Sequence, residues 1–313
     1  MKKVKVSVCC LAYNHQKYIR QTLEGFISQK TNFLYEVLIN DDASTDETAD
    51  IIKEYAVKYP DVIKPIFQTE NQYSKGVVIS NDILAPMAKG DYIAFCEGDD
   101  YWSDPYKLQL QFDIMENNPD VVMVCHNTQK ITCEGKALGV MISGLTEGII
   151  DPVNFIDKSN KNPHFSSLMF RHVVFENKKP DFFRLTTGDN GWRLFSLNFG
   201  KVYYIDRTMS VYRTFVPGSW TVRMRDNKEK SIKHIENTIK FLKEYDKFTK
   251  CKFHSTIENV VTYKEYNYSW LTRNYRNAYL LSKKIKVPLK HKIFLFIWVY
   301  CPCIDKILYK FRK

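Results

Sequence analysis

Three carboxylates follow one apolar stretch of the chain. In "AFCEGDDYW", residues 94–102, Glu97, Asp99 and Asp100 come directly after a run of apolar side chains. Like charges this close repel, and burying them is costly unless a cation lies among them. Such oxygen ligands suit Mg²⁺ or Mn²⁺, which complete their coordination with substrate phosphate oxygens and water. The stretch is therefore either a metal site or a solvated turn, in which Asp and Gly are also common.

Polar residues also follow two other apolar segments. Tyr13 and Asn14 come after the first segment of the chain, and Asp41 and Asp42 come after "YEVLIN". Each pair alone fits an ordinary turn or a helix cap. A carboxylate there could instead accept a hydrogen bond from a ring N–H or a ribose hydroxyl, with an aromatic side chain beside the base. The coincidence of three such clusters is more informative than any one of them.

Apolar segments alternate with stretches of helical periodicity. The pattern predicts strands over 4–11, 35–42, 62–68, 91–100 and 120–131, and helices over 14–30, 44–59, 77–90 and 105–119. Ser44 is the expected N-cap of the second helix, with Glu47 as its capping-box partner. Alternating strands and helices indicate right-handed βαβ units and a mostly parallel sheet. Ligands bind such sheets at the carboxyl ends of the strands, where the polar clusters lie.

The second half of the chain is more irregular. The sequence predicts a helix over 188–200, a strand pair over 201–213 and helices from about 226 to 285. His164 could line a pocket or belong to a core or loop, and Trp102 could stack on a sugar ring or be buried beside the acidic stretch.

The chain lacks both glycine-rich loops that hold phosphates at a helix N-terminus. Neither G-x-G-x-x-G after the first strand nor G-x-x-x-x-G-K-[ST] occurs in the sequence. If a diphosphate binds, a metal must therefore supply much of the positive charge. The acidic stretch and the missing glycines support the same interpretation.

Charge and cysteine content limit the function classes. Of the net charge of +11, the last segment, 283–313, carries +8 and the remaining residues only +3. This asymmetry argues against a broad nucleic-acid surface and for a localised anionic partner. The eight cysteines are scattered, with no C-x-x-C pair and no Cys/His spacing that suggests zinc, which favours a reducing compartment.

The basic C-terminal segment also contains an apolar run. Residues 293–301 are too few to span a bilayer, and Lys290, Lys292 and Lys306 lie close to them. With Phe294 and Trp298 inside it, the run suits an interfacial segment on anionic lipid. The alternative is a terminal helix that packs on the body with solvated lysines.

Four segments in this order resemble the family 2 glycosyltransferases of the GT-A fold: "VSVCCLAYNHQKYIRQTLEGFISQ", "YEVLINDDASTDET", "AKGDYIAFCEGDDYWSDPYKLQLQ" and "TTGDNGWRLF". The resemblance covers about residues 4–220 and is strongest to bacterial enzymes of capsule, exopolysaccharide or lipopolysaccharide assembly. It implies an α/β, Rossmann-like, mostly parallel sheet flanked by helices. The expected GT-A domain is 1–225, with a nucleotide-sugar half to about 104 and an acceptor half from about 105, followed by a helical region, 226–313.

The resemblance assigns a nucleotide site. Ala12, Tyr13 and Asn14 would hold the nucleotide base. Asp42 would direct its carboxylate at the uracil N–H.

The resemblance also assigns the metal and the base. Glu97-Gly98-Asp99 stands where the family has D-x-D, so Asp99 would lie near the ribose or the metal, and Asp100 would be a direct ligand of Mn²⁺ or Mg²⁺. Glu97 replaces the usual first Asp, which leaves its share of the coordination open. Asp189 matches the catalytic base of the family, although its place also fits a helix N-cap.

The activity implied is inverting, metal-dependent transfer of a single sugar from a nucleotide-sugar, with UDP expected, to a glycan or polyprenyl-diphosphate-linked acceptor. The expected location is the cytoplasmic face of a bacterial membrane, reached through the basic tail. The missing Q-x-x-R-W motif argues against a processive synthase. A non-catalytic sugar-nucleotide or glycan-binding module and a nucleotidyltransferase remain alternatives.

Two positions depart from the family pattern. Asn81 stands where an Arg is common, and Phe215 stands where a His often follows "VYR". Arg213 could compensate for the missing cation or be an ordinary surface residue.

Overall fold

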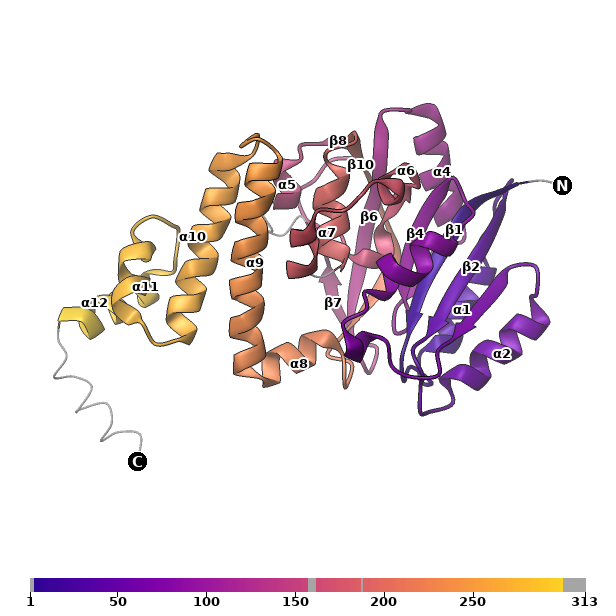
Figure 1. The fold of residues 1–313 in the computed structure, drawn as a ribbon, viewed down its shortest axis with the longest axis horizontal. Helices are drawn as coiled ribbons and strands as arrows, with labels where there is room; N and C mark the ends of the chain where they lie inside the picture. Colours follow the sequence, from indigo (N-terminus) through magenta and orange to yellow (C-terminus); the bar gives the residue numbers. More distant parts are fainter. Residues whose placement is uncertain (1–2, 157–161, 187, 301–313) are drawn as a thin grey trace. The chain divides into compact units, whose positions relative to one another are not determined.

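The computed structural model of the chain describes residues 3–156, 162–186 and 188–300 (Figure 1). The chain divides into two compact units. The first is Met1–Lys179 with Thr187–Ser219, and the second is Pro180–Thr186 with Trp220–Lys313. Each unit is described by itself below.

A single mixed sheet forms the centre of the first unit. Its strands run in the order β3-β2-β1-β4-β9-β6-β10-β5, with β7 paired to β6 and β8 to β10. The strands are β1 Val4–Ala12, β2 Leu34–Asp41, β3 Ile63–Phe67, β4 Tyr92–Glu97, β5 Tyr101–Trp102, β6 Val121–Thr132, β7 Ala137–Val140, β8 Gly148–Ile150, β9 Met169–Arg171 and β10 Lys201–Thr214. The long pairings are parallel, and β9 inserts antiparallel between β4 and β6.

Short helices connect these strands. They are α1 Ile19–Ile27, α2 Thr48–Lys58, α3 Ala85–Met87, α4 Lys107–Asn117, α5 Val153–Ile156, α6 Val173–Glu176 and α7 Gly188–Ser196. Single helical turns lie at Tyr73–Lys75 and Phe165–Ser167, and a π-helical turn, Ser80–Leu84, precedes α3. The expected long helix over 77–90 is thus divided. Pro86 lies in the first turn of α3, where the missing N–H of proline costs no intrahelical hydrogen bond.

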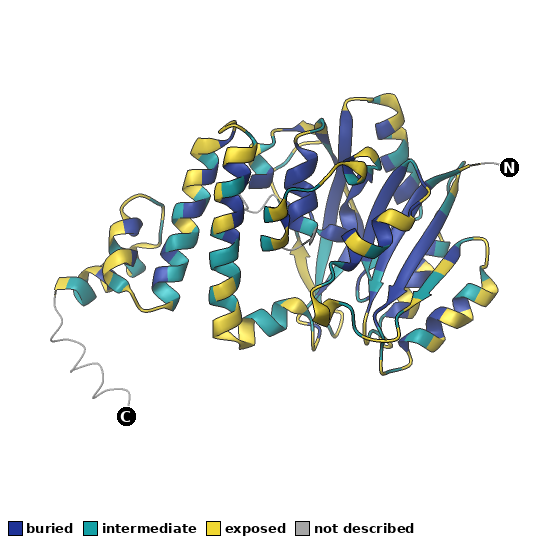
Figure 2. Cartoon of the chain, viewed as in Figure 1, coloured by how far each residue is buried: buried dark blue, intermediate teal, exposed yellow. Residues whose placement is uncertain are grey.

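Both faces of the central strands are buried, as is usual for parallel sheets (Figure 2). On one face, alternate residues of β1 and β4 join a core to which α1, α2 and α4 contribute. On the other face, Phe95 of β4 stacks on Phe165 with ring centroids 4.6 Å apart, and Phe175 contacts Trp192 of α7 at 4.1 Å. This second core positions α7 over the sheet.

The acidic stretch ends on the buried strand β5. Trp102 is 3% exposed, and its Nε1 donates to Ser166 O at 2.9 Å. A Cβ at Gly25 of α1 would lie 2.8 Å from Trp102 O, so only glycine permits this close approach. Of the two interpretations of Trp102, the structure therefore supports burial.

Two predictions about local structure were wrong. The expected strand pair over 201–213 is one continuous strand, β10. Its pairing with β6 is irregular between Ile205 and Ser210, and these irregularities allow the strand to continue. Ser44 does not cap α2, because its hydroxyl donates to Asp41 Oδ1 at 2.5 Å. Asp46 takes that place by accepting from the backbone N–H of Thr48 at 3.0 Å.

The second unit is helical. Its helices are α8 Trp220–Asp226, α9 Lys228–Phe248, α10 His254–Leu271, α11 Tyr275–Ser282 and α12 Leu289–Tyr300, and a turn at Asp181–Leu185 packs on α9. Leu295 of α12 is fully buried against Tyr266, Ala278 and Leu281. Among the residues that the structure describes, no helix combines the length and the apolar composition needed to span a bilayer.

Candidate active site

The three polar clusters lie at one edge of the sheet, because β2, β1 and β4 are adjacent and parallel (Figure 1). Ala12 of β1 pairs with Asp41 of β2, and Leu11 of β1 pairs with Glu97 of β4. The residues that follow these positions therefore emerge side by side at the carboxyl ends. This is the edge where ligands bind in open α/β sheets.

The loop after β1 is held by its own polar groups. Asn14 has a φ of 55°, a left-handed conformation that Asn adopts more readily than most residues. Its Oδ1 accepts from the backbone N–H of Thr45 at 2.8 Å, and its own N–H donates to Ser44 Oγ at 2.9 Å. Ala12 is buried, whereas Tyr13 is 41% exposed. The hydrogen bonds of Asn14 thus order the loop after β1, and the ring of Tyr13 in this loop is accessible.

Asp42 is buried, and both of its carboxylate oxygens accept backbone hydrogen bonds. The N–H groups of Gln72 and Tyr73 donate to them at 2.8 and 3.1 Å. A carboxylate has about four acceptor positions. Asp42 therefore fixes the turn at 72–75 and keeps capacity for about two further donors.

Asp100 is the most deeply buried member of the acidic stretch. It has no exposed surface, and its Oδ1 accepts from the backbone N–H of Arg213 at 2.9 Å. Its Oδ2 is buried without a hydrogen-bond partner. Burial, followed by the charges of Asp99 and Glu97, raises the pKa of Asp100 well above its usual range. An orphaned carboxylate oxygen among other acids fits a site built for a cation.

Glu97 shares this environment. Burial and then the charges of Asp99 and Asp189 raise the pKa of Glu97 to about 8. The acids therefore resist ionising together, because each negative charge disfavours the next. A divalent cation would reverse this balance, since it stabilises the ionised form of every carboxylate that it contacts.

His164 lies against the acidic stretch, and sequence reasoning did not place it there. Its Nδ1 is 3.6 Å from Asp100 Oδ2 and accepts from the backbone N–H of Ser166 at 3.3 Å. Burial lowers the pKa of His164 to about 4, so the ring is neutral near pH 7. The ring also stacks on Tyr212 at 4.2 Å, which fixes its orientation.

Glu97, Asp100 and His164 together form a ligand set. One ligand atom from each lies within 4.8 Å of the others. Two carboxylates and a neutral imidazole are suitable ligands for Mn²⁺ or Mg²⁺, with positions left for water or phosphate. The residues present therefore fit a divalent cation. The sequence analysis considered His164 for a pocket but did not place it at the metal site, because it comes from a loop far along the chain.

Asp99 lies close to a different side chain, that of His15. Its Oδ2 is 3.9 Å from His15 Nε2, while His15 Nδ1 is buried without a hydrogen-bond partner. A Cβ at Gly98 would lie 2.7 Å from His15 Nδ1, so the glycine between the acids allows this contact. Asp99 remains at the site edge, and the three-residue ligand set does not include it.

Arg213 is a buried brace of the acidic stretch. It is 6% exposed, its guanidinium donates to Asp99 O and to Gln21 Oε1, and it lies 4.8 Å from the Tyr101 ring centroid. Its side chain is thus committed to holding the loop. It is neither a surface residue nor an exposed cation for a diphosphate.

Asn81 has a structural role in this chain. It is 6% exposed, and its Oδ1 accepts from Trp192 Nε1 on α7. Lys179 lies 4.3 Å from the Trp192 ring centroid. The position where the family often has Arg is used here to hold α7 in place.

Asp189 lies in the first turn of α7. Its charge acts on Glu97, on His164 and on Arg193. Burial lowers the pKa of Arg193, and the negative charge of Asp189 partly opposes that decrease. Asp189 therefore belongs to the same charge cluster as the ligand set. A carboxylate beside the cation but outside its ligand set can accept a proton from a bound hydroxyl.

Comparison with known proteins identifies the family and agrees with the fold. Residues 7–173 match the family model for glycosyl transferase family 2. The match covers more than half of the chain, so the chain belongs to this family. The crystal structure of Staphylococcus aureus TarS 1–349 in complex with UDP has a TM-score of 0.58 at 15% sequence identity, covering 92% of this chain and 77% of that one. This likeness confirms the predicted GT-A fold.

Relatives with higher sequence identity cover parts of the chain. An uncharacterised protein of Mycobacterium tuberculosis H37Rv is 30% identical over 233 residues, which are 72% of this chain and 63% of the relative. This chain thus spans less than two thirds of that protein. Escherichia coli WfaP, named as a UDP-Glc:alpha-D-GlcNAc-diphosphoundecaprenol beta-1,3-glucosyltransferase, is 39% identical over 111 residues, 36% of this chain and 41% of WfaP.

Proposed function

We propose that the chain is an inverting, metal-dependent glycosyltransferase that adds a single sugar during bacterial surface polysaccharide synthesis. The donor is a nucleotide-sugar with UDP as the nucleotide, and the acceptor is a glycan or a lipid-linked glycan. The observation that carries this proposal is the convergence of ligand atoms from Glu97, Asp100 and His164, with the Oδ2 atom of Asp100 buried and without a hydrogen-bond partner. A sheet edge that binds a diphosphate without a glycine-rich phosphate loop needs such a site.

Each group of the site has a role in this proposal. Glu97, Asp100 and His164 would hold Mn²⁺ or Mg²⁺, which acts as a Lewis acid and offsets the negative charge of the departing nucleoside diphosphate. Tyr13 would flank the base, and Asp42 would accept from its ring N–H.

Asp189 acts on the acceptor. Its carboxylate takes the proton of the acceptor hydroxyl as that oxygen attacks the anomeric carbon. The new bond forms on the face opposite the leaving diphosphate, so the configuration inverts. Asn81 and Trp192 position the helix that carries this carboxylate.

The nucleotide assignment is supported by the UDP complex of TarS and by the UDP-glucose donor in the name of WfaP. A panel of sugar nucleotides incubated with Mn²⁺ tests the assignment. Hydrolysis confined to UDP-linked sugars supports it, and hydrolysis confined to sugars on another nucleotide contradicts it.

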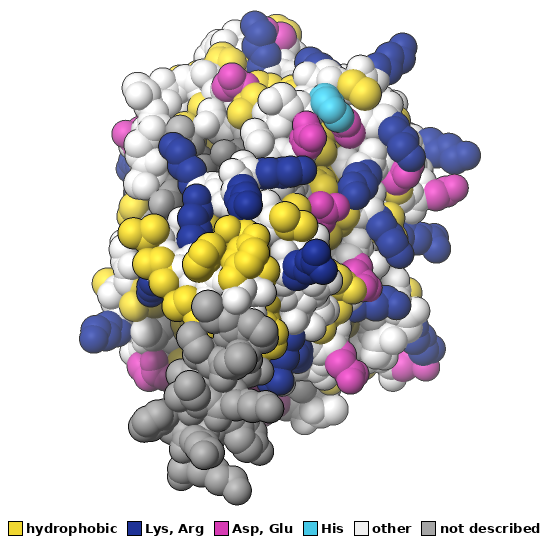
Figure 3. Space-filling model, turned by 90° about the vertical axis from the view of Figure 1, so that its left-hand side faces the viewer, with side chains coloured by type: hydrophobic (Ala, Val, Ile, Leu, Met, Phe, Trp, Pro, Cys, Tyr) yellow, Lys and Arg dark blue, Asp and Glu magenta, His cyan; other side chains and the backbone are white. Residues whose placement is uncertain are grey.

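The acceptor and the membrane form the second part of the proposal. WfaP is named for an acceptor linked to diphosphoundecaprenol, and we propose a lipid-linked acceptor for this chain too. In the second unit, Leu289, Ile293 and Phe296 of α12 are 72%, 51% and 50% exposed, although Leu295 is buried. Apolar and basic side chains lie together on the face shown in Figure 3.

This arrangement suits peripheral binding to the inner face of the cell membrane. The lysines at 283, 284, 286 and 290 are exposed beside the apolar face of α12. Each lysine near an anionic surface contributes about 1 kcal/mol. α12 packs on its own unit through Leu295 and through ring contacts of Phe294 and Trp298, and the exposed side chains of Leu289 and Ile293 remain available to lipid. The rest of the predicted tail, 301–313, lies outside the described residues.

Deletion of residues 286–313 is expected to abolish binding to anionic liposomes, measured by co-sedimentation. Because the deletion also removes the buried Leu295, a double variant, Leu289→Glu with Ile293→Glu, serves as the control that keeps the packing. It should bind anionic liposomes much more weakly than the unaltered chain does. Unchanged binding by both proteins would leave α12 as an ordinary terminal helix.

A further inference from the structure

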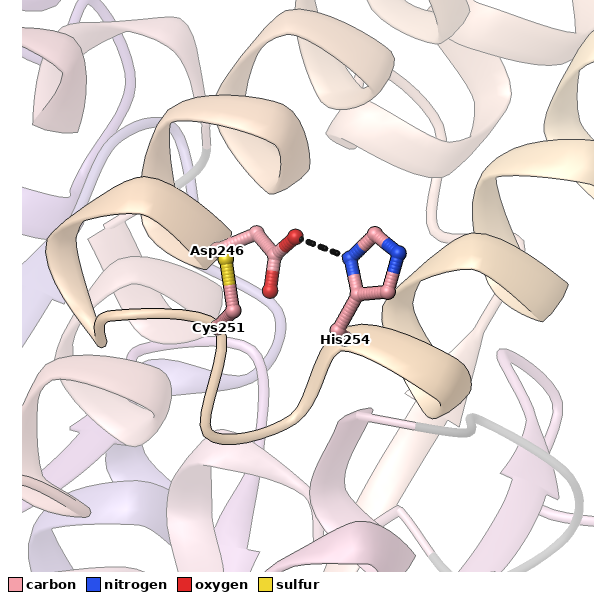
Figure 4. A group of neighbouring side chains, drawn as sticks. All are labelled: Asp246, Cys251 and His254. Carbon is pink, nitrogen blue, oxygen red and sulfur yellow. Dashed lines mark hydrogen bonds and ion pairs between the residues drawn. The ribbon is translucent and has the colours of Figure 1, made fainter.

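A second group of metal-binding side chains lies in the helical unit, between α9 and α10 (Figure 4). Asp246 belongs to the last turn of α9, Cys251 to the connecting turn, and His254 begins α10. One ligand atom from each lies within 4.8 Å of the others. In Figure 4 the Asp246 carboxylate lies between the other two side chains. The three donors therefore converge on one point.

Asp246 has an orphaned oxygen directed at this group. The residue is 9% exposed, and its Oδ2 accepts from His254 Nδ1 at 2.7 Å. Its Oδ1 is buried and has no hydrogen-bond partner. Leaving a buried carboxylate oxygen without a donor is unfavourable, because the lost hydration is not replaced. A cation at this point would supply the missing partner.

The backbone brings the thiol to the carboxylate. Lys250 and Cys251 have φ values of 52° and 61°, a conformation that residues with a Cβ rarely adopt twice in succession. The Cys251 N–H donates to Asp246 O at 2.8 Å, and the His254 N–H donates to Cys251 O at 3.2 Å. The turn is thus folded back against the end of α9, and the Cys251 side chain is held close to Asp246.

The chemistry of the three donors is specific. A thiolate, an imidazole and a carboxylate form the mixed ligand set that Zn²⁺ prefers, whereas Mg²⁺ and Mn²⁺ prefer oxygen. Three protein ligands leave one tetrahedral position for water. We propose that Asp246, Cys251 and His254 form a second metal site, which binds Zn²⁺ and closes the turn between α9 and α10.

The site is separate in chemistry and in place from the acidic cluster of the first unit. It joins two helices and has a structural effect, because a bound ion links the end of α9 to the start of α10. The spacing of Cys251 and His254 alone did not indicate zinc, because the third donor comes from the preceding helix.

The test is Zn²⁺ binding by the full chain without an added histidine tag. After removal of metals with a chelator, Zn²⁺ is titrated in competition with a chromophoric chelator, and Co²⁺ is used as a spectroscopic probe. In the Asp100→Ala background, which disables the acidic cluster, we expect one equivalent of Zn²⁺ and a thiolate-to-cobalt absorption band. Adding Cys251→Ala or His254→Ala should weaken Zn²⁺ binding at least about 100-fold, since losing even an outer-shell partner costs 10- to 100-fold.

Matched controls decide between the outcomes. Cys133→Ala, which removes a thiol of the first unit, and the double variant Cys301→Ala with Cys303→Ala should keep both the Zn²⁺ and the absorption band. In the Asp100→Ala background, Zn²⁺ should raise the melting temperature, and adding Cys251→Ala should remove that rise. Zn²⁺ binding that survives in the Asp100→Ala, Cys251→Ala double variant, or an absorption band that disappears in a control variant, would overturn the assignment. So would the absence of Zn²⁺ binding in a folded Asp100→Ala protein.

Discussion

Asp189→Asn is expected to lower the rate of sugar transfer by about 100- to 10,000-fold, the usual contribution of a general base. An amide has the shape of the carboxylate but cannot take the proton from the acceptor hydroxyl. UDP affinity in the presence of Mn²⁺ should be unchanged, because Asp189 lies outside the ligand set of Glu97, Asp100 and His164. Transfer is measured as glycosylated acceptor formed, and affinity by isothermal titration with UDP.

The control is Asp113→Asn, which makes the same change at an exposed carboxylate of α4 and should keep full activity. An Asp189→Asn enzyme that transfers sugar normally would remove Asp189 as the base. If the unaltered chain binds UDP but transfers nothing to any acceptor, the non-catalytic binding module becomes the better account.

Asp100→Ala is expected to weaken metal-dependent UDP binding at least about 100-fold, because losing a direct ligand costs more than losing an outer-shell partner. The orphaned Oδ2 is the atom best placed to contact the cation. His164→Ala should weaken the same binding, and Asp99→Ala should weaken it less. UDP titrations at several Mn²⁺ concentrations measure all three effects.

Proton competition offers an independent check on the same site. Metal binding requires ionised ligands, so a site whose acids have raised pKa values binds metal more tightly as pH rises. Burial, Asp99 and Asp189 raise the pKa of Glu97 to about 8, so the affinity for Mn²⁺ should increase from pH 6 toward that value. UDP binding that needs no metal, or that is unaffected by Asp100→Ala, would contradict the site assignment.

The sheet edge could be predicted from sequence because its signals are local. Strand ends can be read from runs of apolar residues, and parallel strands bring their carboxyl ends together. This reasoning placed Asp42 and Asp100 at the same edge of the sheet from positions far apart in the chain. It also identified α7, because "GDNGWRLFS" has helical periodicity with Asp189 at its start.

The remaining features depend on contacts that no local pattern encodes. His164 approaches Asp100 only because the turn at Phe165–Ser167 packs beside β4. Ser44 satisfies the capping rule for α2, yet its hydroxyl instead donates to Asp41 and accepts from the backbone N–H of Asn14. Asn81 looks like a lost binding residue until its bond to Trp192 is seen.

The most direct test of the central claim is the identity of the product released from the donor. The purified chain is incubated with UDP-sugars and Mn²⁺, and the release of UDP is measured with and without EDTA. The account predicts that UDP is released from a UDP-sugar, that EDTA stops the release, and that Asp100→Ala abolishes it. Release of diphosphate from UTP, with no UDP formed from any UDP-sugar, would contradict the account and identify a nucleotidyltransferase.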